Sequence, residues 1–167
     1  MDEPLTSRTG FATKGWNRDR FMMFVSKTEV EAELFLDDGS IFAGVVYVRP
    51  TEELGKVHPM LDLLGGRERI IPCRGESGEL VLIGRASVSA VRVADETFGL
   101  PDSGGVNLSM KLTMAGGHRF EGTLQLPESD GTRISDLLNY ADPWLVQIGD
   151  SHHVWVATDK LVRAEAP

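Results

Sequence analysis

Apolar and acidic residues alternate between positions 29 and 37. The apolar positions are Val30, Ala32, Leu34 and Leu36, and the acidic ones are Glu29, Glu31, Glu33 and Asp37. A period of two predicts a β-strand with one buried face and one exposed face. The Asp38-Gly39 pair that follows favours a hairpin turn, because glycine tolerates a positive φ. We therefore expect a return strand over residues 41–48, bent at Gly44.

The same pattern recurs later in the chain. Leu34 to Gly44 aligns with Leu112 to Gly122, since each segment has an apolar strand, a turn glycine, a phenylalanine three residues later and a second glycine after two more. Two further matches follow in the same order. They pair Leu61 to Leu64 with Ser135 to Leu138, and Val81 to Val91 with Val154 to Ala164. Three matches in one order predict two copies of one module.

Each copy contains about five short apolar segments that are interrupted by glycines. A small sheet left open would expose much edge and bury little core, so closure is expected. The sequence therefore predicts a mainly β protein with two tandem five-stranded small barrels, short helical turns and a flexible N-terminal arm. The expected boundaries are 1–28 for the arm, 29–97 for the first barrel, 98–105 for a linker and 106–167 for the second barrel.

Two segments of the first copy resemble a known family. Val30 to Leu34 followed by Asp38 to Gly44 resembles the first Sm motif, and Val81 to Val91 resembles the second. The resemblance implies an Sm-like fold, or the related SH3-like small barrel. Sm-like proteins usually form rings by pairing edge strands between subunits, and they bind RNA on loops that line the pore. The loop between residues 48 and 64 lacks the Asp and Asn positions of the family.

The charge of the chain is acidic overall and uneven along its length. The 17 basic and 25 acidic residues give a formal net charge of -8. That balance disfavours a main role in coating nucleic acid or an anionic membrane. Residues 1–28 alone are net positive, with five basic and three acidic residues. These basic residues are interspersed with aromatic ones, so this arm is a candidate for docking onto a partner.

Candidate catalytic and metal-binding groups are few. Cys73 is the single cysteine, which excludes an internal disulfide and a cysteine-based zinc site. His152 and His153 are adjacent, so on a strand they point to opposite faces and do not chelate one metal ion together. No nucleophile elbow or phosphate loop occurs. We predict no enzyme activity, no metal and no cofactor. The absence of a signal peptide and of a membrane span favours a cytoplasmic protein of bacterial type.

The expected function is a non-catalytic protein-interaction or assembly module. It would act as an oligomer or as a subunit of a larger complex, through its sheet edges and the arm. The candidate contact residues are Phe11, Trp16, Arg18, Arg20, Phe21, Phe24 and Trp155. An Sm-like RNA-binding regulator is the first alternative, with Arg67, Arg69, Arg74 and Arg85 as its candidate site. A small-molecule binder is the second, for which Tyr140, Trp144 and Trp155 form the local aromatic cluster.

Overall fold

The computed structural model describes residues 27–94, 98, 105–127, 133–139 and 143–166. The elements in chain order are β1 (Thr28–Leu36), β2 (Ile41–Val48), α1 (Thr51–Leu54), α2 (Pro59–Gly65), β3 (Ile70–Arg74), β4 (Leu80–Gly84), the 3₁₀ turn η2 (Arg85–Ser87), β5 (Val88–Ala94), β6 (Gly105–Met114), η4 (Ala115–Gly117), β7 (Arg119–Pro127), α3 (Ile134–Asn139), β8 (Trp144–Ile148), β9 (His152–Ala157), η5 (Thr158–Lys160) and β10 (Leu161–Glu165). The protein is mainly β, as predicted.

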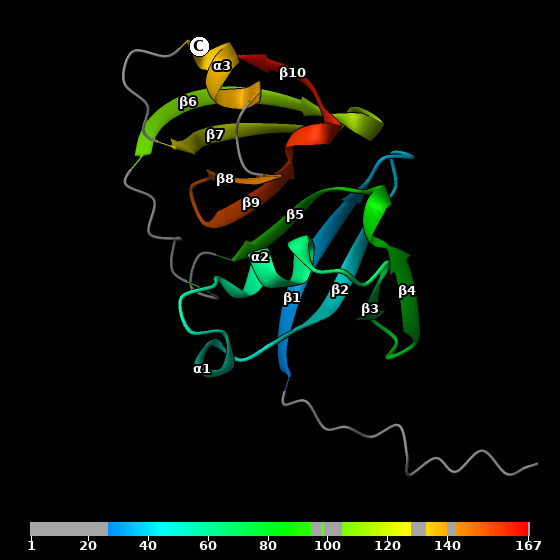
Figure 1. The fold of residues 1–167 in the computed structure, drawn as a ribbon. Coiled ribbons are helices and arrows are strands. Elements are labelled where there is room, and N and C mark those ends of the chain that lie inside the picture. Colours follow the sequence, from blue (N-terminus) through cyan, green and yellow to red (C-terminus); the bar gives the residue numbers. More distant parts are fainter. Residues whose placement is uncertain (1–26, 95–97, 99–104, 128–132, 140–142, 167) are drawn as a thin grey trace, which may run out of the picture.

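All ten strands belong to one antiparallel sheet with the order β10-β6-β7-β8-β9-β5-β1-β2-β3-β4 (Figure 1). The prediction of two closed barrels is wrong, because the sheet stays open. Closure of the first five strands would require β4 to pair with β5, but β5 pairs with β1 on one side and with β9 on the other. The edge exposure that favours closure is relieved instead by joining the two halves of the chain edge to edge.

The two halves of the sheet repeat the same strand order. β5-β1-β2-β3-β4 in the first half corresponds to β10-β6-β7-β8-β9 in the second. The register repeats as well: Leu34 lies opposite Phe42, and Leu112 lies opposite Phe120. The pairing of β1 with β5 and that of β6 with β10 each contain one register shift, at corresponding positions. The sequence repeat therefore corresponds to a repeated three-dimensional arrangement.

Gly44 and Gly122 occupy corresponding positions on β2 and β7, where the backbone of the next strand lies very close. A Cβ atom at Gly44 would lie 2.4 Å from the carbonyl oxygen of Arg74, and one at Gly122 would lie 2.3 Å from that of Ile148. These carbonyls belong to β3 and β8, the strands that pair next to β2 and β7. Only glycine lets the neighbouring backbone approach this closely.

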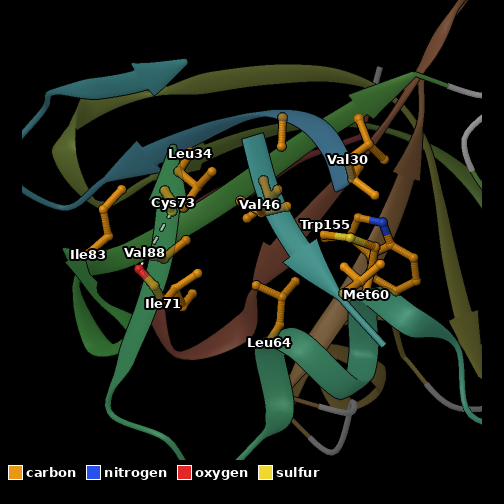
Figure 2. Close-up of a cluster of buried hydrophobic side chains, with 14 of the residues drawn as sticks. Val30, Leu34, Val46, Met60, Leu64, Ile71, Cys73, Ile83, Val88 and Trp155 are labelled. Carbon is orange, nitrogen blue, oxygen red and sulfur yellow. Dashed lines mark hydrogen bonds between the residues drawn. The ribbon is translucent and has the colours of Figure 1, made fainter. Parts of the chain in front are cut away.

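The buried side chains form two cores, one for each half. The first core includes Met60 and Leu64 of α2, which pack with side chains of the strands (Figure 2). The second core is built mainly from β6, β7, β8 and β9. Each half also contributes a side chain to the core of the other half. Trp155 of β9 belongs to the first core, and Phe35 of β1 belongs to the second. The alternation of side chains along each strand makes this exchange possible, since neighbouring residues face opposite sides of the sheet.

Candidate functional site

The junction between β5 and β9 is the contact that joins the two halves. Val91 lies opposite Trp155, and Ala90 lies opposite Val156. The Val91–Trp155 pair faces the first core and the Ala90–Val156 pair faces the second, so both faces of the junction are buried. Trp155 is only 2% exposed, and its ring lies 4.7 Å from the ring of His58 at the start of α2. Its contact is therefore internal to the chain.

The hairpin tips provide a second attachment between the halves. Nε2 of His118 lies 2.7 Å from the carbonyl oxygen of Leu36, and Nζ of Lys160 lies 3.0 Å from a carboxylate oxygen of Asp37. The first tip turns at Gly39, whose φ of 89° confirms the predicted glycine turn. Hydrogen bonds from Ser40 to Asp38 lower the pKa of that carboxyl and hold the turn.

The outer strands β4 and β10 each have one neighbour in the sheet that the structure describes. Both carry large apolar side chains in contact with water. Leu80 and Leu82 of β4 are 70% and 62% exposed, and Val162 of β10 is 69% exposed. Exposed apolar edge strands with unpaired backbone groups are natural sites for pairing with another chain. We take these two edges as the candidate functional site.

The sequence does not single out these edge residues. Leu80 to Ile83 is a continuous apolar run, which predicts a strand but not which of its faces is exposed. The repeat alignment holds the missing signal. Leu82 corresponds to Trp155, since Leu82 lies opposite Pro72 and Trp155 lies opposite Val146 in the equivalent pairings. Trp155 is buried on β9, whereas Leu82 is exposed at the corresponding position of β4.

A cavity of about 500 Å³ opens beside the β10 edge, between α3 and that strand. Met110, Ile134, Leu138 and Ala164 contribute its apolar wall. Ile134 is 38% exposed, although it lies on the helix that borders the second core. The candidate edge on β10 is thus accompanied by an open apolar recess.

The four arginines of the RNA-binding alternative do not form one site. Arg67 and Arg85 line a cavity of about 800 Å³ together with Tyr47, next to α2. Arg74 lies elsewhere, where its Nη2 donates a hydrogen bond of 2.6 Å to Glu29. Arg69 is exposed, and its carbonyl accepts a hydrogen bond from the backbone N–H of Arg85.

The remaining candidate groups offer little chemistry among the residues described. No group of three or more His, Cys, Asp or Glu side chains there is arranged to hold a metal ion. Cys73 is fully buried, and burial raises the pKa of its thiol to about 11, which keeps it protonated and unreactive. Trp144 is partly buried against the first core. Tyr140 and the arm residues Phe11, Trp16, Arg18, Arg20, Phe21 and Phe24 lie outside the described residues.

Comparisons with known proteins add no further assignment, because no family model, no curated protein and no solved structure matches the chain. Within the described part of the chain, no helix has the length and apolar character needed to cross a membrane. The candidate site therefore rests on the geometry of the sheet itself.

Proposed function

We propose that this protein is a non-catalytic assembly module that joins other protein chains through its two open sheet edges. It would work as an oligomer or as a subunit of a larger complex, with the N-terminal arm as a second point of attachment. The proposal rests on one observation above all. β4 and β10 present unpaired edges with exposed apolar side chains, in a sheet that is already extended once by edge pairing between β5 and β9.

The internal junction supports edge pairing as the mode of contact. It pairs five residues of each strand and buries side chains on both of its faces. Main-chain hydrogen bonds and alternating side-chain contacts are the means by which a strand adds to a sheet edge. The outer edges belong to strands that correspond to those of the junction, since β4 corresponds to β9 and β10 corresponds to β5.

We also infer that the halves are degenerate copies of one five-strand unit of Sm-like or SH3-like type. The repeated strand order and register support this relationship. The units would span residues 29–97 and 106–167, with 98–105 as the linker, and would be open rather than closed. In this interpretation the protein is a fused pair of modules of a kind that associates by its edges.

Sedimentation of the full chain over a range of concentrations tests the proposed function. We expect the wild type to form species larger than the 18.3 kDa chain. Leu80→Lys combined with Val162→Lys places a charge on each open edge and should return the protein to a monomer. Val57→Lys is a matched control, because Val57 is 50% exposed but lies between α1 and α2. A wild type that stays monomeric at high concentration and binds no protein of its host would contradict the proposal.

One observation favours RNA binding as a second candidate function. Nε and Nη1 of Arg85 are buried and donate no hydrogen bond, and Arg67 shares the same cavity. Nη2 of Arg85 lies 3.4 Å from a carboxylate oxygen of Glu68, so one edge of the guanidinium is paired and the other is buried without a partner. Buried N–H groups without an acceptor favour an anion such as a phosphate. Fluorescence anisotropy with a single-stranded RNA at low salt tests this candidate. Arg85→Met should abolish binding, whereas Arg74→Met, outside the cavity, should not. Absence of binding by the wild type at low salt would exclude it.

A further inference from the structure

We propose that the cavity between α3 and β10 is a socket for Leu82 of a second copy of this chain. The inference rests on the proposed function, because it names the partner and the side chain that the β10 edge receives. It is drawn from the first half of the molecule, where the corresponding socket is already filled.

In the first half, the socket is closed by a side chain from the other half. Trp155 enters from β9 and packs beside Met60 of α2, in the core that also contains Leu64 and Val91 (Figure 2). Every one of these side chains is at most 2% exposed. The tryptophan therefore completes a core that β1, β5 and α2 leave open at one side.

In the second half, the corresponding positions line the cavity of about 500 Å³. Their correspondence follows from the sequence repeat and the strand register. Five residues that surround Trp155 in the first half have counterparts in the second half. In matching order, the pairs are Met60 with Ile134, Leu64 with Leu138, Val91 with Ala164, Ala32 with Met110, and Val93 with Ala166. The first set is buried around Trp155, whereas Ile134 is 38% exposed. Within the described chain, the second socket is left without its insert.

The same correspondence identifies the insert. Trp155 lies opposite Val91 at the junction, so its counterpart should lie opposite Ala164 on β10. That counterpart is Leu82 of β4, which is 62% exposed and therefore available. His153 lies opposite Val93 at the junction, and its counterpart Leu80 would lie opposite Ala166. Both exposed leucines of β4 thus acquire apolar partners in a second copy.

This contact joins unlike edges, so it runs head to tail. Each chain offers the Leu82 edge on one side and the socket edge on the other. A contact between two different surfaces leaves one of each free, and such contacts either close into a ring or extend as a filament. Two chains that each lack one of the surfaces would stop at a dimer.

Two variants test this arrangement. Leu82→Lys removes the insert and leaves the socket intact, whereas Ala164→Glu blocks the socket and leaves the insert intact. We expect each variant alone to be monomeric, with self-association weakened by about 100-fold. Leu82→Lys replaces the inserted leucine by a charge that cannot be buried in an apolar recess, and Ala164→Glu places a charge in the recess itself. Mixed in equal amounts, the two variants should form a one-to-one dimer and no larger species, as measured by native mass spectrometry.

Val57→Lys serves as the control for an added surface charge, and thermal melts by circular dichroism check that each variant is folded. If the wild type assembles but both variants do so equally well, the socket inference is overturned while the proposed function stands. If Leu82→Lys is monomeric, Ala164→Glu still assembles and the mixture gains nothing, the β4 edges pair with one another, which also overturns it. If Ala164→Glu and Trp16→Ala abolish assembly while Leu82→Lys does not, the N-terminal arm fills the socket instead. A monomeric wild type would overturn both proposals.

Discussion

Replacement of Gly44 by alanine should destabilise the fold where β2 and β3 approach each other closely. The added Cβ would lie 2.4 Å from the carbonyl oxygen of Arg74, short of the 3.0 Å that real Cβ atoms keep. β3 would have to move by at least the 0.6 Å between these two distances, and only two residue pairs hold it to β2. Overpacking of this kind costs about 1–3 kcal/mol. Alanine also lowers the conformational entropy of the unfolded chain, which offsets about 0.4–1 kcal/mol of this cost.

From the middle of each range we expect a net loss of about 1.3 kcal/mol in the free energy of unfolding, measured by urea denaturation with the slope unchanged. Gly122→Ala should lose a similar amount, because its Cβ would lie 2.3 Å from the Ile148 carbonyl oxygen. Gly65→Ala is the control, since nothing lies within 4 Å of its added Cβ. A Gly44→Ala protein as stable as the wild type would refute the close-approach argument. Unequal losses at the two glycines would refute the equivalence of the two sites.

Three further predictions concern Trp155 at the junction, Cys73 in the first core and Lys160 at the hairpin tips. Trp155→Ala should lower the free energy of unfolding by about 3–5 kcal/mol, whereas Trp155→Phe should cost much less, because it keeps most of the ring and removes an Nε1 that has no hydrogen-bond partner. Cys73 should resist a thiol reagent until the protein unfolds. Because burial raises its pKa from 9.0 to about 11, the unfolded chain loses this proton first. The contribution of the Cys73 thiol to the free energy of unfolding should thus be constant below pH 9 and fall by up to about 1.4 kcal/mol per pH unit between pH 9 and 11. Denaturation curves of Cys73→Ala measured over the same pH range should lack this slope. Lys160→Ala should change stability by less than about 1 kcal/mol in the same assay, because its ion pair with Asp37 is partly exposed.

The sequence predicts the local structure and the repeat because both depend on short-range patterns. Alternation from Val30 to Leu36 gives β1, and the aligned glycines Gly44 and Gly122 mark the two close approaches between neighbouring strands. The short helical turns that the sequence predicts are present, with α2 and α3 at corresponding places in the two copies. Each of these features follows from residues that are neighbours along the chain or aligned between the copies.

The sequence does not predict which edge strand pairs with which. Alternation places Trp155 on one face of its strand with His153, but it cannot say that this face completes the core of the other half. The preference for closed barrels follows from edge exposure within each copy. In the structure, the two copies cover one edge each by pairing β5 with β9, and neither copy closes. The sequence does not predict the exposure of Leu80 and Leu82 for the same reason. The apolar pattern of a strand does not indicate whether that strand lies at the edge or in the middle of the sheet.

The β5–β9 junction differs from the outer edges in its dependence on concentration. Because both strands belong to one polypeptide, each meets the other at a local concentration set by the connecting segment rather than by the amount of protein in solution. Dilution therefore leaves this pairing intact, while any contact made by β4 or β10 weakens as the protein becomes scarce. The pairing that holds the two halves together is therefore independent of how much protein is expressed. Association through the open edges increases with protein concentration.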